Sequence, residues 1–179
     1  MPTKRRAALR RAAVTSAAAG IALGLIAAPA AACPKHRQGV TRVKGPTHTY
    51  HRGYSAVKEV VTVHGARGRT VVDLRVSGFP RSAAGKRFGA HVHQNKCGPK
   101  ASHSGTHYQR LARSSTPLRF KEIWLDVRID RDGRGHSRAV VPWRVAKGQR
   151  SVVIHAKPTD RRTGEAGARL LCTTVPFGR

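Results

Sequence analysis

The segment FGAHVHQNKCGPKASHSGTHYQ, residues 88–109, is the most informative part of this chain and contains four of its ten histidines. His91 and His93 are separated by one residue, so in a strand both side chains point to the same side. Their Cα atoms then lie about 6.5 Å apart, close enough for two imidazoles to meet at one metal ion. Cys97 and His107 follow in a loop rich in Gly, Ser and Pro, which can bring a third ligand across.

Short strands are predicted on both sides of this segment. Residues 57–64 (VKEVVTVH) and 70–76 (TVVDLRV) are rich in β-branched side chains, and Gly65-Ala-Arg-Gly68 forms a turn between them. Residues 121–130 alternate as in a half-buried strand. One face has Ile123, Leu125, Val127 and Ile129, and the other has Glu122, Trp124, Asp126 and Arg128. Further strands are predicted at residues 86–93, 136–145, 152–156 and 169–175.

The pattern as a whole predicts an all-β domain. Outside the first 32 residues no segment has sustained helical periodicity. About eight antiparallel strands with turn signals between them indicate a sandwich or a flattened barrel. Residues 98–118 have neither helical nor strand periodicity and are predicted to form a long loop. Long loops inside compact domains are usually functional.

The first 32 residues have the pattern of a secretory signal peptide. A basic segment with five Lys and Arg precedes a mostly apolar run over residues 12–28, and Ala30-Ala31-Ala32 offers a cleavage site. The run is short and rich in Ala and Gly, which makes it a poor transmembrane span. The Arg5-Arg6 pair permits twin-arginine export as well as the general route. We therefore predict a secreted or envelope-associated protein.

Residues 33–53 are polar and basic with little periodicity, and they predict a flexible N-terminal arm ahead of a domain at 54–179. Cys33 comes directly after the small residues of the leader. Two interpretations of Cys33 stay open: a lipid-modified N-terminal cysteine, or an unpaired thiol at a mobile end. Ala30 stands where a lipid-attachment motif usually has Leu.

The net charge is extreme, +27 at pH 7, and a surface of this kind attracts anions. Three interpretations remain open. The charge steers a small anionic substrate, holds the protein on an acidic cell wall or membrane surface, or reflects a background proteome rich in Arg and Ala. Nucleic acid is not an expected partner, because the chain has no zinc-finger spacing, helix-turn-helix pattern or aromatic-plus-basic signature.

Three segments in sequence order resemble the copper/zinc superoxide dismutase family. The histidine pair, the cysteine and Gly-Thr-His-Tyr (105–108) resemble its copper site. SVVIHAK (151–157) resembles the strand with its fourth copper histidine. AGARLLC (166–172) resembles its closing motif, an active-site arginine three residues before a disulfide cysteine. The resemblance extends over roughly residues 59–175 and implies a Greek-key β-barrel.

The resemblance implies a set of copper ligands, and imidazole nitrogens suit that metal. The four residues are His91, His93, His107 and His155. In the family, the histidine at the position of His107 bridges copper and zinc, and two more histidines and an aspartate complete the zinc site. Between His107 and Asp130 this chain has no histidine. His103 alone does not make a tetrahedral site, so the chain resembles the copper-only branch of secreted bacterial proteins, without zinc.

Metal-bound imidazoles need an acceptor on their other ring nitrogen. The only acids between His107 and Asp130 are Glu122 and Asp126, on the polar face of their predicted strand. Two interpretations stay open for them. They orient the site histidines, or they are surface carboxylates paired with some of the many arginines.

The resemblance also implies a disulfide between Cys97 and Cys172, which an exported protein permits, and an anion-guiding role for Arg169. The expected function is that of an exported copper-dependent superoxide dismutase, with superoxide as substrate and His107 as a proton carrier. The alternative is a catalytically weak or inactive protein of the same fold. That protein would bind copper, an acidic cell-wall polymer or another polyanion.

Overall fold

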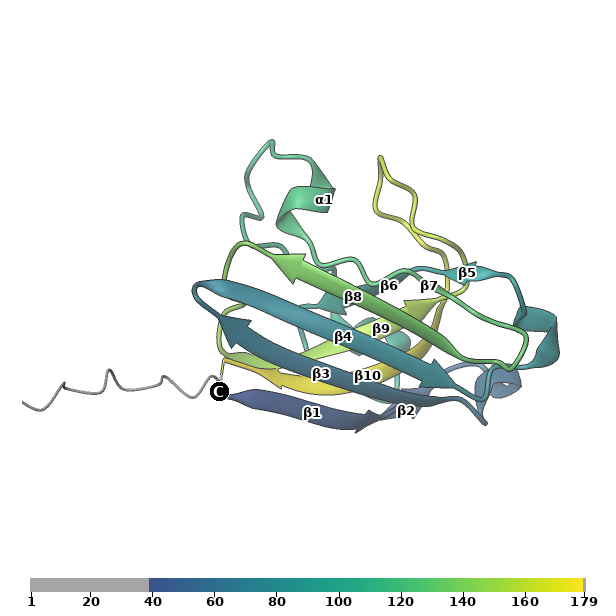
Figure 1. Ribbon diagram of the computed structural model, residues 1–179. Helices are drawn as coiled ribbons and strands as arrows, with labels where there is room; N and C mark the ends of the chain where they lie inside the picture. The colour runs from purple at the N-terminus through teal and green to yellow at the C-terminus, as the bar shows by residue number, and fades with distance from the viewer. Residues whose placement is uncertain (1–38, 179) are drawn as a thin grey trace, which may run out of the picture. The chain divides into compact units, whose positions relative to one another are not determined.

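The computed structural model describes residues 39–178, in which hydrogen-bonded strands form three antiparallel sheets (Figure 1). The first contains, in spatial order, β1 (Val40–Gly45), β3 (Lys58–Ala66), β4 (Arg69–Ser77) and β8 (Gly135–Val141). The second contains β2 (His48–Thr49), β10 (Arg169–Phe177), β9 (Gly148–His155) and β6 (Ala90–His93). The third pairs β5 (Arg87–Phe88) with β7 (Val127–Arg128).

Helical segments are short. They are η1 (Arg52–Tyr54), η2 (Arg81–Ala83), η3 (Ala101–Ser104) and α1 (Leu118–Lys121). The prediction of an antiparallel all-β fold is confirmed. The ladders do not close into one barrel within residues 39–178. In the same residues, no helix is long and apolar enough to cross a membrane.

The second sheet is buried on both faces near the predicted metal ligands. In β9, Val152 and Ile154 belong to the main apolar core, whereas Val153 on the opposite face packs against the two cysteines Cys97 and Cys172. Five consecutive residues of β9, from 151 to 155, are therefore buried. Because the long loop covers this outer face, histidines that project from it are shielded from water.

The segment predicted as a strand over residues 121–130 forms only the short strand β7 and one bridge between Trp124 and His91. The predicted apolar face is confirmed, since Ile123 and Leu125 are almost fully buried. The first part differs because α1 begins directly after Pro117, and the amide of Glu122 bonds to the carbonyl of Leu118. This helical turn leaves only the second half of the segment free to extend.

The flexible arm predicted over residues 33–53 is wrong from residue 39 onward, since this part belongs to the same compact unit as the rest. β1 pairs with β3 along its whole length, and β2 pairs with β10. β1 is an edge strand, and only one of its sides is half-buried. Its sequence is therefore mostly polar and lacks the apolar pattern that would predict a strand. The predicted signal peptide, residues 1–32, and Cys33 lie outside the described residues.

A buried carboxyl group occupies the start of β3. Glu59 lies opposite Gly45 of β1, is 1% exposed, and accepts a hydrogen bond of 2.7 Å from Thr173 Oγ1. A Cβ at Gly45 would overlap Thr173, so glycine permits this close approach. The other carboxyl oxygen of Glu59 has no hydrogen-bond partner among the described residues. Burial raises the pKa of Glu59 to about 7, and the bond from Thr173 opposes this shift only in part.

Glu59 should make the free energy of unfolding decrease as pH rises. Its raised pKa means that the folded protein keeps a proton which the unfolded chain, with a pKa near 4.5, has already lost. The stabilisation is fully present below pH 4.5 and is lost as pH rises through about 7, a loss of about 3 kcal/mol. Glu59→Gln should remove this part of the pH dependence in urea unfolding measured from acid to neutral pH. Parallel stability curves for both proteins would contradict the assignment.

Candidate metal centre

Four histidines from two strands and a loop meet on the outer face of the second sheet. His91 and His93 project from β6, and His155 ends the neighbouring strand β9. His107 is brought to them by a bridge to His93 after the loop that contains η3. One ring nitrogen from each lies within 4.8 Å of the others. All four predicted ligand residues therefore lie in one cluster that could hold a metal ion, though the cluster does not identify the metal.

Two of the four rings are fixed by backbone carbonyls. His93 Nδ1 lies 3.0 Å from the oxygen of Gly105, and His155 Nδ1 lies 3.0 Å from the oxygen of Gly167. A carbonyl can only accept, so Nδ1 carries the proton in both rings and Nε2 presents a lone pair to the cluster. The two Nε2 atoms are 3.2 Å apart. Lone pairs this close repel each other unless a cation or a proton lies between them.

Glu122 fixes the third ring. His107 Nδ1 donates to Glu122 Oε2 at 3.0 Å, and Gln109 and Trp124 donate to the same carboxylate at 2.7 Å each. Burial alone would raise the pKa of Glu122, but the bonds from His107, Trp124 and Gln109 together hold it below its usual value. Glu122 is thus a carboxylate, and it turns His107 Nε2 towards the cluster. Of the two interpretations of Glu122, the structure supports the orienting one.

The fourth ring, that of His91, is linked to Asp126 through the side chain of Thr159. His91 Nε2 lies 2.7 Å from Thr159 Oγ1, and the Thr159 hydroxyl donates to Asp126 Oδ1. The Thr159 amide also donates to Asp126 Oδ2 at 3.1 Å. Asp126 therefore acts on His91 only through Thr159. Thr159 was not predicted as a site residue, because it lies in a loop four residues after His155 and belongs to no recognisable motif.

His91 Nδ1 is left facing the cluster, and it has no hydrogen-bond partner among residues 39–178 although it is buried. Burial and the neighbouring imidazoles lower the pKa of His91 far below its usual value. Burial also lowers the pKa of His93 to about 2 and that of His155 to about 4. These rings are neutral at physiological pH, so their lone pairs are available to a metal. The orphaned nitrogen and the all-imidazole donor set both suit a transition-metal ion, and imidazole binds zinc, copper, iron and nickel.

A cleft of about 440 Å³ leads to the cluster, with His107, His155 and Arg169 among its lining residues. The loop before and including α1 forms one wall, and the loop between β9 and β10 forms the other; Figure 1 shows both projecting from one side. The walls approach each other at Gly164, where an added Cβ would lie 3.1 Å from Leu118 Cδ1. Gly164 has a φ of +75°, so a larger residue there would be strained as well as crowded.

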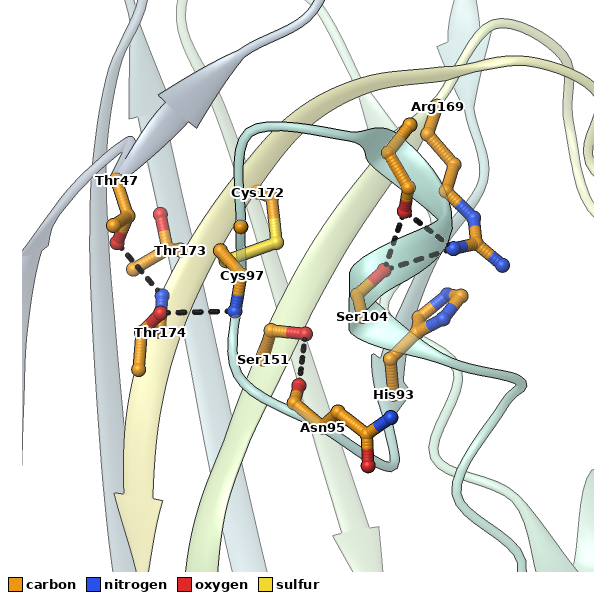
Figure 2. Close-up of a disulfide and its surroundings, with 12 residues drawn as sticks. Thr47, His93, Asn95, Cys97, Ser104, Ser151, Arg169, Cys172, Thr173 and Thr174 are labelled. Carbon is orange, nitrogen blue, oxygen red and sulfur yellow. Dashed lines mark hydrogen bonds between the residues drawn. A yellow bond between two sulfur atoms is a disulfide. The ribbon is translucent and has the colours of Figure 1, made fainter.

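Arg169 ties the cleft to the loop that precedes His107 (Figure 2). Its Nη1 donates to the Ala101 carbonyl at 2.6 Å and to Ser104 Oγ at 2.9 Å, and its Nη2 donates to the Gly105 carbonyl at 2.7 Å. Arginine has five N–H groups, so Nε–H and one Nη2–H have no partner within the described part of the chain. These two groups remain available to an anion in the cleft.

The predicted disulfide between Cys97 and Cys172 is confirmed, and it anchors the same loop to β10. His103, considered as a zinc ligand, is exposed and does not belong to the histidine cluster. Within residues 39–178 no second group of three or more His, Cys, Asp or Glu side chains is placed to share an ion.

A comparison of the chain with models of known protein families finds no match, and a comparison with curated proteins finds no similar sequence. The interpretation of the centre therefore depends on its own geometry.

Thr159 should matter for metal affinity because it fixes the ring of His91. Thr159→Val removes the hydroxyl that joins His91 to Asp126, and such orienting contacts typically contribute 10–100-fold to metal affinity. We expect weaker Cu(II) binding of about that size in chelator competition, with altered hyperfine splitting in electron paramagnetic resonance. Thr159→Ser keeps the hydroxyl and serves as the matched control. Unchanged affinity and spectra in Thr159→Val would show that Thr159 does not orient His91.

Proposed function

We propose that this protein is an exported copper-dependent superoxide dismutase that works without zinc. The observation that carries the proposal is a cluster of four imidazoles, three of them buried and neutral, beside an arginine at the end of an open cleft. A site that only stored copper would need neither the cleft nor the cation. Bound copper would supply one-electron exchange with two superoxide anions in turn, so that two anions and two protons give oxygen and hydrogen peroxide.

Arg169 binds and orients the anion. Its two free N–H groups can donate to the oxygens of superoxide, and a guanidinium stays charged at any physiological pH. The whole chain has 35 Lys and Arg against 8 Asp and Glu, and an excess of positive charge raises the local concentration of anions. That contribution should weaken as salt screens it.

His107 accepts and donates a proton at the cleft. It is the one ligand residue that is not buried, with a side chain 17% exposed, and Glu122 fixes the proton on its Nδ1. Its Nε2 could therefore take a proton from solvent whenever it is not bound to the metal, and pass that proton to the peroxide product. Glu122 also occupies the nitrogen that would face a second metal, which supports a centre without zinc.

The proposed family is that of the copper/zinc superoxide dismutases, in its copper-only branch. The strand order supports a Greek-key arrangement of the two large sheets, because β4 neighbours β8 and β6 neighbours β9 without being consecutive along the chain. The chain also passes from one sheet to the other between β1 and β2. The disulfide is compatible with the proposed export.

A second candidate is a copper-binding protein with little or no turnover. The observation that favours it is that Arg169 already donates three hydrogen bonds to the loop before His107. An arginine with that many structural contacts has a sufficient role as a clamp, and the rigid set of imidazoles would still hold copper tightly.

Variants of Arg169 and His93 separate the two functions. The assay uses protein that begins at Pro34, with its disulfide formed and Cu(II) added. We expect fast dismutation that declines as salt increases, and loss of both copper and activity in His93→Ala. In Arg169→Ala we expect retained copper and a rate about tenfold lower and less dependent on salt. Arg169→Lys, which keeps the charge, should recover part of the rate.

Tight copper uptake with no rate above that of a non-specific copper complex would overturn the dismutase and establish the binding protein instead. A full rate in Arg169→Ala with copper still bound would overturn only the anion-binding role of Arg169 and leave the arginine as a clamp.

A further inference from the structure

One end of the described unit carries four cations on segments that contain no Asp or Glu. Arg67 and Arg69 lie at the turn between β3 and β4, and Arg144 and Lys147 lie between β8 and β9. All four are exposed, and we call them the basic end. Residues 60–72 and 133–159 contain no Asp or Glu. No ion pair within residues 39–178 involves any of the four.

The two segments of the basic end lie together (Figure 1). Thr70 pairs with Val141 across the β4–β8 ladder, and the amide of Val145 donates to Thr70 Oγ1 at 3.0 Å. A small cavity of about 100 Å³ separates them, lined in part by Gly65, Thr70 and Arg144. A ligand that engages cations from both segments must extend across this cavity, so the arrangement suits a long anion better than a single small one.

The turn has an unexpected residue. Arg67 has a φ of 43° and Gly68 a φ of 81°, so both central residues of this two-residue turn are left-handed. Turns of this kind favour Asn-Gly, and a side chain such as arginine is uncommon at a positive φ. The chain thus places a cation at the tip of the hairpin where asparagine would be the more stable choice. The charge is the property that arginine adds there.

The basic end also lies away from the metal cleft. β9 begins directly after Lys147 and ends at His155, and this length of strand spans about 25 Å. β10 likewise runs from Arg169 in the cleft to Phe177, whose neighbour Gly178 packs against Lys147. A ligand bound at the basic end would leave the cleft open.

We propose that the basic end binds a linear anionic polymer with repeated phosphate or sulfate groups and orients the metal cleft away from it. Uncompensated cations on two adjoining segments neutralise several charges of such a chain at once and release its counterions. This binding is independent of the proposed dismutase activity.

The test compares charge removal at the two ends of the same strands. Arg144→Gln/Lys147→Gln removes two cations of the basic end. Arg131→Gln/Arg134→Gln is the matched control, because both arginines are exposed in the turn before β8, at its far end. Fluorescently labelled polyphosphate and dextran sulfate are titrated with the full mature protein at several salt concentrations, and anisotropy reports binding.

We expect Arg144→Gln/Lys147→Gln to weaken binding at least about fivefold more than the control does. We also expect it to reduce the salt slope, which is the slope of log affinity against log salt concentration, by about two in magnitude. Arg67→Asn should reduce the slope by about one while raising the melting temperature by a few degrees, because it removes the charge and relieves the turn. Opposite effects on binding and stability cannot result from misfolding.

Stronger binding of polyphosphate than of dextran sulfate would identify phosphate as the preferred group, and the reverse would identify sulfate; either result supports the proposal. Equal losses in both double variants would overturn it, because the attraction would then come from net charge alone. It would also be overturned if vesicles of phosphatidylglycerol and phosphatidylcholine responded to Arg144→Gln/Lys147→Gln and neither polymer did, since the basic end would then be a membrane contact.

Discussion

The carbonyl oxygen of Gly105 accepts hydrogen bonds from both His93 Nδ1 and Arg169 Nη2, and the metal centre depends on this shared acceptor. One bond fixes the tautomer and orientation of a ligand ring on β6. The other holds the guanidinium at the edge of the cleft. A loop carbonyl thus couples the position of the anion-binding group to the position of a metal ligand. The disulfide strengthens this coupling, because it joins the start of the same loop to the strand of Arg169.

Covering the outer face of the second sheet has an electrostatic consequence. An imidazolium loses its hydration when it is buried, so the rings of His91, His93 and His155 stay neutral. Each neutral ring then needs an acceptor for its single N–H, and the surrounding loops provide Gly105, Gly167 and Thr159 for this purpose. Burial and outer hydrogen bonding together direct four lone pairs to one place before any metal arrives. The loops therefore preorganise the site as much as the strands do.

The strand spacing of His91 and His93 was enough to predict that they share a face, and the alternation in residues 121–130 was enough to predict the buried side of that segment. Two features were not predictable in the same way. β1 is stabilised by cross-strand bonds and by a close approach at Gly45, neither of which requires apolar residues, so its polar sequence resembled an arm. Thr159 acquires its role only because the loop after β9 folds back over His91, a long-range contact that no local pattern encodes.

Glu122 shows how a carboxylate keeps a specific role in a chain so rich in arginine. Its three donors, His107, Gln109 and Trp124, are all neutral or weakly basic, and no arginine reaches it among the described residues. Burial explains this selectivity, because a guanidinium would lose hydration that one carboxylate bond cannot replace. The indole and the amide lose far less, so they can surround the carboxylate and hold it ionised. The burial that keeps the ligand rings neutral therefore also keeps arginine side chains away from Glu122, so that Glu122 stays hydrogen-bonded to His107.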